Sequence, residues 1–282
     1  MKVVVAVDGS RHGRWATQWI SRMPWKLTPD ISALHVLDIS SVRATFVIQP
    51  TVIGNERFIR DEIKRLVVRK NKVVADTEAA LRSVGLKGAV RTEKGPVANT
   101  IVRNAPKRNG MLVVGSRGLD KLDRLMLGSV SLHATLHASC PVFVAKARPR
   151  PIRRIVLAVD GSKSAEKAAH FLTKVLSAKT STHAIQVMIV HVMPSIASNS
   201  VKEAASKLTS HYSHRLRAAG YQVKEILLKG NPAEKLVPFV ARQKADFIVM
   251  GARGLGAIAR FLLGSVSLNV VQLSRCSVLI VR

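Results

Sequence analysis

The chain is poor in several features that define other classes of protein. Only two cysteines occur in 282 residues, which excludes a secreted scaffold held together by disulfides. Aromatic residues make up 4% of the sequence, too few for a protein that stacks single-stranded bases on aromatic rings. Acidic residues are outnumbered, with 17 Asp and Glu against 45 Lys and Arg. The hydrophobic fraction of 47% is nevertheless sufficient for a folded core, which argues against a disordered chain.

Long apolar runs are missing as well. No stretch of about 18 uncharged apolar residues occurs, so we expect no transmembrane helix. The apolar run after Lys2 ends at Asp8, which is too short for the apolar region of a signal peptide. We therefore expect a soluble protein located in the cytoplasm.

The most informative feature that is present is an internal repeat. Five segments of the first half return in the same order in the second half: Val3–Ser10 as Ile155–Ser162, Leu34–Val36 as Val190–Val192, Lys94-Gly95 as Lys229-Gly230, Leu112–Leu119 as Ile248–Leu255, and Leu127–Leu132 as Leu263–Leu268. Ordered matches along the whole chain predict a duplicated domain. We place the first domain at residues 1–147, a linker rich in proline and charge at 148–153, and the second domain at 154–282.

The two copies differ in length after their second predicted strand. His35 and Gly115 are 80 positions apart, whereas the matching His191 and Gly251 are 60 positions apart. The first copy therefore carries about 20 extra residues around Ile39–Ile63, a long connection for a compact domain. This insertion is apolar enough to cap the first site or to dock a partner. Additional core cover or a dimer contact would explain it equally well.

Strands and helices are expected to alternate within each copy. The continuous β-branched runs Val3–Val7 and Ile155–Val159 are typical of strands that are buried on both faces. The segments Ala165–Leu176 and Val201–Ala219 have the apolar spacing of helices. This alternation predicts a doubly wound α/β fold with a parallel sheet in each copy. Sheets of this kind bind ligands at the carboxyl ends of their strands, where the strand order reverses.

A pair of glycine motifs with identical spacing predicts an anion site in each copy. In the first copy Gly115 and Gly118 follow a predicted strand, and after nine further residues Gly128 and Ser129 open a helix. Glycine lets a ligand approach the backbone, and the first N–H groups of a helix attract anions. We expect Ser129 to cap this helix and Arg117 to contact phosphate. The alternative is that the glycines only form turns, but the repetition of the spacing argues against it.

The pattern Gly-x2-Gly-x9-Gly-Ser, after a strand that ends in Val-Asp-Gly-Ser, resembles the ATP-binding universal stress proteins. The chain as a whole resembles the tandem form of this family. The resemblance implies a five-stranded parallel sheet in each copy and ATP in a cleft at the carboxyl ends of the strands. ADP or AMP could take the place of ATP, and Mg²⁺ could accompany the nucleotide. The resemblance also implies that the two fifth strands pair the halves into an internal pseudo-dimer.

The resemblance assigns the same set of positions to the nucleotide in both copies. Around the base and the ribose it implies Ala6, Val7, Asp8 and Val36, with Ala158, Val159, Asp160 and Val192 in the second copy. Around the phosphates it implies Gly115, Arg117, Gly118, Gly128, Ser129 and Val130, with Gly251, Arg253, Gly254, Gly264, Ser265 and Val266 in the second copy. An Asp before Gly-Ser can also be a plain turn former, and this alternative stays open for both aspartates.

The charges between the motif glycines distinguish the two copies. The first copy has Asp120, Lys121, Asp123 and Arg124 there, whereas the second has only Arg260. Two carboxylates near a triphosphate would repel it unless a divalent metal intervenes or they face away. We therefore expect the second site to bind nucleotide more tightly.

The remaining histidine and cysteine candidates have structural explanations. His35 and His191 lie on apolar strands without a paired acid or nucleophile, so we interpret them as core residues rather than catalysts. Cys140 and Cys276 lack a Cys-x-x-Cys partner and are expected to be small buried apolar residues. A redox role would require both to be exposed near the axis between the copies. The sequence thus predicts no catalytic group and no metal site.

The net charge of +28 is spread over both halves and exceeds what nucleotide binding requires. A basic surface of this size attracts nucleic acid or anionic lipid in a salt-dependent way. Three hypotheses follow: an ATP-binding stress or signalling sensor, a slow ATPase, and a basic nucleic-acid or membrane-surface binder with vestigial nucleotide sites. We favour the first, with weak hydrolysis at most, because no candidate base appears in both copies. Its expected partners are the nucleotide, the other half of the same chain and, as an alternative assembly, a second copy.

Overall fold

The computed structural model describes residues 1–38, 56–83, 85–86, 88–107, 109–118, 127–180, 183–255 and 263–282, with the backbone alone at 56–59. Residues 39–55 of the predicted insertion lie outside this part of the chain. The charged residues 120–124 and Arg260 also lie outside it. The expected difference in affinity between the two copies therefore stays a prediction.

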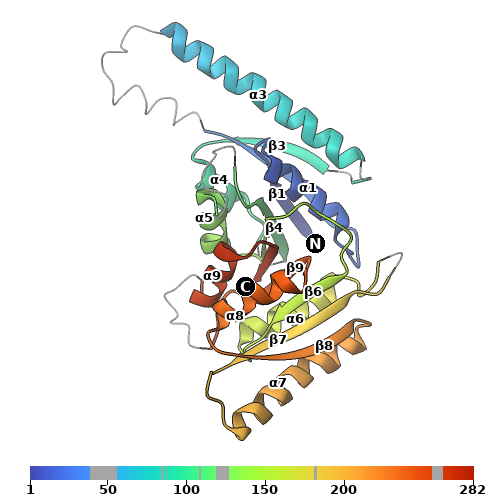
Figure 1. Cartoon of the computed structure of the whole chain (residues 1–282). Coiled ribbons are helices and arrows are strands. Elements are labelled where there is room, and N and C mark those ends of the chain that lie inside the picture. The colour runs from blue at the N-terminus through green and yellow to red at the C-terminus, as the bar shows by residue number, and fades with distance from the viewer. Residues whose placement is uncertain are drawn as a thin grey trace.

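Strands and helices alternate along both halves, as Figure 1 shows. The first half contains β1 (Lys2–Ala6), α1 (Arg11–Arg22), β2 (Asp30–Leu37), α3 (Glu56–Ser83), β3 (Gly88–Lys94), α4 (Val97–Asn104), β4 (Gly110–Gly115), α5 (Ser129–His137) and β5 (Val142–Ala145). The second half contains β6 (Arg154–Ala158), α6 (Lys163–Val175), β7 (Gln186–Met193), α7 (Asn199–Ala218), β8 (Gln222–Lys229), α8 (Pro232–Arg242), β9 (Phe247–Gly251), α9 (Ser265–Leu273) and β10 (Ser277–Val281).

In the described residues ten strands form one continuous sheet, in the order β3-β2-β1-β4-β5-β10-β9-β6-β7-β8. Within each half all neighbouring strands are parallel, and the order reverses beside the first strand of that half. The two halves meet where β5 and β10 pair antiparallel, with Phe143 opposite Leu279. This arrangement confirms two tandem doubly wound domains joined through their fifth strands.

The helices bury both faces of this sheet. One core layer lies beneath α1, α3, α6 and α7, and the other lies beneath α4, α5, α8 and α9. Successive residues of β1 point into opposite layers, with Val3 and Val5 in the first and Val4 in the second. This double burial explains why the strand is a continuous apolar run rather than an alternating one.

Aromatic packing ties the two halves together. The ring of Trp19, from α1, lies 5.4 Å from that of Phe143 in the first half and 6.2 Å from that of Phe247 in the second. The two phenylalanine rings are 5.7 Å apart at an angle of 78°. Rings at these distances and angles pack favourably, so the halves share one core across the strand pair.

The linker is fixed to the second half by a buried carboxylate. Asp246, at the start of β9, is 5% exposed and accepts hydrogen bonds from the backbone N–H groups of Arg153 and Arg154 at 2.7 and 2.8 Å. Its other oxygen accepts from Nε of Arg150 at 2.5 Å. The first copy has Asn109-Gly110 where the second has Ala245-Asp246. Asp246 therefore fixes the linker, and the first half has no carboxylate at the equivalent position, Gly110.

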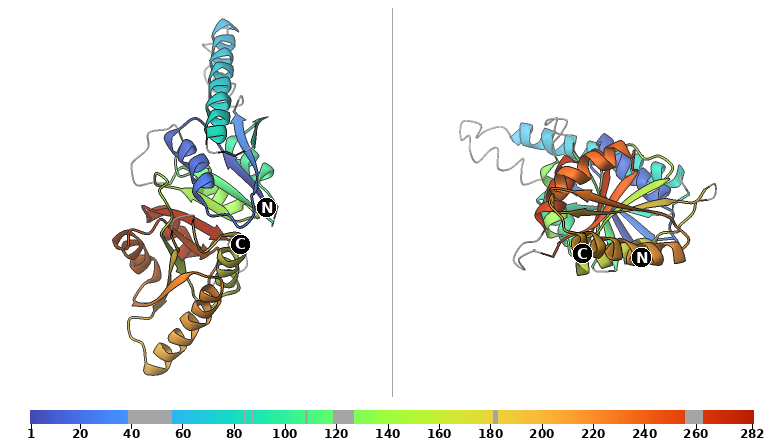
Figure 2. Two further views of the ribbon diagram at one scale, coloured as in Figure 1. Left: turned by 90° about the vertical axis from the view of Figure 1, so that its right-hand side faces the viewer. Right: turned by 60° about the horizontal axis from the view of Figure 1, so that its bottom comes forward.

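Helix α3 accounts for part of the extra length of the first copy. It has 28 residues, whereas the equivalent α7 has 20. Its C-terminal half packs on the sheet through Val73, Thr77 and Leu81, which are buried. Its N-terminal part extends beyond the sheet, as the left view of Figure 2 shows. No described helix, α3 included, combines the length and the apolarity that a membrane span needs.

Candidate functional site

The turn after the first strand of each half is built by an aspartate, a glycine and a serine. Gly9 has a φ of +79°, a conformation that side chains rarely adopt, and this reverses the chain toward α1. Oδ1 of Asp8 accepts the N–H of Ser10 at 2.9 Å, and Oγ of Ser10 accepts the N–H of Gly13 at 3.0 Å. The serine thereby caps α1. Gly161 and its neighbours repeat this geometry at the start of α6.

The second aspartate oxygen lies against the glycine motif. Oδ2 of Asp160 accepts the N–H of Leu255 at 3.2 Å, and a Cβ added to Gly254 would lie 2.6 Å from the same oxygen. In the first half, a Cβ on Gly118 would lie 3.0 Å from Oδ2 of Asp8. Each aspartate therefore forms the turn with one oxygen and contacts the motif loop with the other. The interpretation as a turn former is thus confirmed for both aspartates, and contact with a ligand stays a prediction.

The first glycine of each motif serves packing. A Cβ on Gly115 would lie 2.7 Å from the backbone of His12, and one on Gly251 would lie 2.5 Å from Cβ of Ser164. The absence of a side chain at these two glycines therefore lets the starts of α1 and α6 pack against the ends of β4 and β9. Hydroxyl groups then connect each motif to the next helix, since Oγ of Ser131 donates to the carbonyl of Gly115, and Ser267 donates to Gly251 in the same way.

The helices that follow the motifs begin with glycine, and the prediction that Ser129 is the cap was wrong. Gly128 is the N-cap residue of α5, where its carbonyl accepts the N–H of Leu132 and its own N–H donates to Ser116. Gly264 has the same role in α9. No side chain of the described residues caps either helix. The first N–H groups of α5 and α9 are therefore left for an external acceptor, whereas serines cap α1 and α6.

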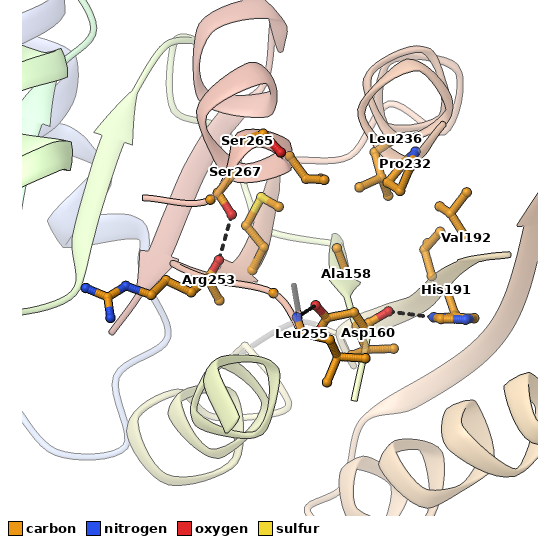
Figure 3. Close-up of a pocket in the computed structure, with 17 residues that line it drawn as sticks. Ala158, Asp160, His191, Val192, Pro232, Leu236, Arg253, Leu255, Ser265 and Ser267 are labelled. Atoms are coloured by element: carbon orange, nitrogen blue, oxygen red, sulfur yellow. Dashed lines mark hydrogen bonds between the residues drawn. The ribbon is translucent and has the colours of Figure 1, made fainter. Parts of the chain in front are cut away.

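In the second half the predicted residues surround one cavity of about 330 Å³, which Figure 3 shows. The ten predicted residues that line it are Ala158, Val159, Asp160, Val192, Gly251, Arg253, Gly254, Gly264, Ser265 and Val266. Seven further lining residues were not predicted: Val190, His191, Pro232, Leu236, Met250, Leu255 and Ser267. Most of these seven residues flank a predicted one or come from α8, which carries no recognisable motif.

The cavity has an apolar and a polar wall. Val192, Pro232 and Leu236 lie on one side, and Ser265 lies across from them at the start of α9 (Figure 3). Nδ1 of His191 donates to the carbonyl of Val159 at 2.9 Å, which fixes the ring beside Asp160. Such a cavity suits a ligand with one flat apolar end and one anionic end.

The first half repeats the bond between the strand histidine and the turn, but its helix α1 begins with a different residue than α6 does. The carbonyl of Val7 accepts from Nδ1 of His35 at 2.8 Å, as its counterpart does in the second half. At the start of α1, His12 is 8% exposed, and burial, with Arg117 and Arg11 nearby, lowers its pKa. The second half has Ser164 at that position. A buried imidazole therefore stands beside the motif of the first half where the second half has a small hydroxyl side chain.

The predicted residues of the first half occupy equivalent places. The motif loop contacts Asp8, and the start of α5 lies beside the loop, since a Cβ on Gly128 would lie 3.3 Å from the carbonyl of Ser116 and 3.4 Å from Cα of Arg117. The other predicted residues there are Ala6, Val7, Val36, Gly115, Gly118, Ser129 and Val130, which come from β1, β2, β4 and α5 or the loops directly after these strands.

Comparison with known proteins identifies relatives along the whole chain. A model described as the universal stress protein family matches residues 1–146 and again residues 151–282. A universal stress protein of Mycolicibacterium smegmatis is 27% identical over 99% of this chain and 96% of its own length. One from Thermus aquaticus is 35% identical over 46% of this chain and 98% of its own length. The crystal structure of a universal stress protein from Archaeoglobus fulgidus covers 100% of this chain and 98% of its own, with a TM-score of 0.69 and 21% identity, and has the same fold.

Proposed function

This chain belongs to the universal stress protein family, and from that premise we propose that it binds ATP in both halves and acts as a stress-response or signalling sensor of nucleotide. One observation carries this proposal. Ten residues from four separate segments, chosen for their motif, line a single cavity at the carboxyl ends of the strands. The uncapped start of α9 opens onto this cavity, and a helix start without a side-chain cap binds phosphate well.

We assign the parts of the nucleotide to the walls of the cavity. The adenine would lie against the apolar wall around Val192 and Leu236, and the ribose would lie near Asp160. The phosphates would accept hydrogen bonds from the N–H groups of Ser265 and Val266. Mg²⁺ would neutralise phosphate charge. Asp160 is the one carboxylate among the described lining residues, and it would be the side chain available to the metal ion.

We expect hydrolysis to be slow at most. Attack of water on the γ-phosphate needs a group that orients the water or accepts its proton. Among the described lining residues, Asp160 and His191 could accept a proton. Asp160 already accepts two backbone N–H bonds, and the ring of His191 is fixed by a backbone carbonyl. Loss of turnover with binding retained in Asp160→Asn would favour the slow ATPase instead.

Nucleotide extraction is the first test of this proposal. The purified chain would be denatured, and the released nucleotide identified by mass spectrometry and counted per chain. About two ATP per chain would support binding in both halves, and about one would support the expected difference between the copies. If none is released and calorimetry detects no ATP uptake, the proposal is wrong.

A substitution at Gly264 localises the bound nucleotide. A Cβ there would meet its nearest atoms at 3.5 Å or more, so the fold accepts a side chain at this position. Gly264→Val should nevertheless fill the phosphate end of the cavity and remove one bound nucleotide. Leu273→Ala, at the exposed far end of the same helix, is the matched control and should bind as the wild type does. Unchanged stoichiometry in Gly264→Val would contradict the assigned site.

The exposed face of α3 favours a second candidate function, non-specific contact with nucleic acid. Between Lys64 and Lys72 the helix has five basic residues and no acidic one. Arg69 and Lys72 are both exposed near the middle of the helix. Of the apolar side chains that the structure describes on this helix, only Val67 and Val68 are largely exposed, and two valines are too few to anchor a helix in lipid. A phosphate backbone therefore suits this face better than a membrane does.

A further inference from the structure

A cation directly after each fifth strand reaches into the other half of the molecule. Lys146 follows β5, and its Nζ donates to the carbonyls of Val271 and Gln272 at 2.7 and 3.1 Å. Both carbonyls belong to the last turn of α9 in the second half. Lys146 is thus a residue of one half that caps a helix of the other.

The second half returns this contact. Arg282 follows β10, and its Nη2 donates to the carbonyls of Thr135 and Leu136, the latter at 2.9 Å. These carbonyls belong to the last turn of α5 in the first half. The carbonyls at the end of a helix lack partners within it and carry the negative end of its dipole, so a cation there stabilises the helix end.

The two capped helices are the ones that open the proposed nucleotide sites. The start of α5 lies at the first site and the start of α9 at the second. Each has nine residues, which makes it about 13 Å long and rigid over that length. A displacement of its capped end therefore changes the position of its first N–H groups.

Each cation also lies close to the motif arginine of its own half. The backbone of Ser116, beside Arg117, bonds to Ala145, beside Lys146, and Ala252 bonds to Val281 in the same way. Burial, and to a smaller extent repulsion from Arg117, holds the pKa of Lys146 down at about 8. Burial and repulsion from Arg253 lower that of Arg282. The side chain of Arg253 extends away from Asp160 in Figure 3.

We propose that the two nucleotide sites are coupled through Lys146 and Arg282. Phosphate at the first site attracts the guanidinium of Arg117, and this relieves its repulsion of Lys146. Lys146 then holds the end of α9 more firmly, and the start of α9 is better placed to bind phosphate at the second site. Arg253 and Arg282 connect the second site to α5 in the same way, and each route acts in both directions because coupling between two sites is reciprocal. The coupling rests on the proposed function, since it requires nucleotide in both halves.

The coupling predicts cooperative binding that depends on Lys146. Calorimetric titration of the nucleotide-free chain with ATP would measure the affinity of the second site with the first site intact and with the first site blocked by Gly128→Val. We expect blocking to weaken the second site by a factor of about five or more. In Lys146→Met, blocking the first site should weaken the second site less than it does in the wild type, and in Lys146→Met with Arg282→Met it should leave the affinity of the second site unchanged.

Two control variants separate coupling from a general effect on folding. Lys146→Arg keeps a cation at this position, as the second half does at Arg282. In this variant the affinity of the second site should again depend on the first site. Lys202→Met removes an exposed cation from α7 and should behave as the wild type does. If blocking the first site weakens the second site as much in Lys146→Met as in the wild type, the coupling through this residue is wrong while the proposed function stands. If wild-type chain binds no ATP at all, both proposals fall.

Discussion

Two glycines of one motif differ in the space that surrounds them. A Cβ on Gly254 would lie 2.6 Å from Oδ2 of Asp160, whereas one on Gly264 would lie 3.5 Å from its nearest atom. Gly254→Ala should therefore displace the carboxylate, weaken ATP binding in the second half by about tenfold and lower the melting temperature. Gly264→Ala should leave the melting temperature unchanged. Thermal unfolding and calorimetry of the two variants would check this, and equal melting temperatures would count against the close contact.

Lys146 should leave a signature in the pH dependence of stability. Burial lowers its pKa from 10.5 to about 8 in the folded chain, so between these values the unfolded chain binds more protons. Stability contributed by this residue must then rise with pH across that interval. We expect the free energy of unfolding of the wild type to increase relative to that of Lys146→Met between pH 7.5 and 9.5, as measured by urea denaturation at each pH. A constant difference would show that Lys146 titrates normally.

The two thiols should be unreactive in the folded chain. Cys140 is buried and Cys276 partly buried, and burial raises the pKa of both thiols above its usual value. Because the thiolate is the reactive form, alkylation by iodoacetamide at pH 7.5 should be slow until denaturant exposes both groups. Mass spectrometry over time would count the modified residues. Rapid labelling of either one in the native chain would revive the redox interpretation.

At the scale of single elements, the basic face of α3 provides the test of nucleic-acid contact. The double variant Arg69→Glu with Lys72→Glu should weaken binding to duplex DNA and reduce the slope of log affinity against log salt by about two. Lys202→Glu with Lys207→Glu, on the exposed face of α7, is the matched control and should change binding less. Fluorescence anisotropy at several salt concentrations would measure both. If both double variants lose DNA affinity equally, the net charge of the chain, and not the face of α3, determines the binding.

The elements also show what the sequence pattern could predict and what it could not. The strand expected at Val3–Val7 forms one residue earlier, and the helix expected at Ala165–Leu176 begins two residues earlier, because apolar periodicity follows burial closely. The cap of α5 was predicted wrongly. Serine is usually preferred as a cap, yet Gly128 takes that position because its own N–H bonds back to the motif loop.

Contacts between distant parts of the chain lay beyond the sequence pattern. Asp246 holds a linker that is more than 90 residues away, and Lys146 bonds to carbonyls 125 and 126 positions further along. Neither residue belongs to a local motif, and only the pairing of β5 with β10 brings Lys146 to α9. The repeat predicted that the halves would pair, but it carried no information about which side chains would meet.

At the scale of the whole molecule, the pairing of the halves predicts the behaviour of a separated half. Residues 148–282 alone would expose β10 and the side of Phe247 that packs against Trp19 and Phe143. Since β5 and β10 are equivalent strands, two copies of this half should pair through β10 and form a homodimer. Size-exclusion chromatography with light scattering would report its mass. A stable monomer would mean that the strand pair contributes little to holding the halves together.

The antiparallel junction of β5 and β10 has a further consequence for how this chain can change over generations. In a symmetric homodimer every substitution at the interface appears twice, once on each side. Here the two sides of the interface are separate positions of one polypeptide. A substitution on one side can therefore occur alone, and a second substitution on the other side can compensate for it. Lys146 facing one helix and Arg282 facing the other already represent such a divergence. The long α3 opposite the shorter α7 is another. Because the two halves are covalently linked, their sequences can diverge, and the two halves can acquire different functions.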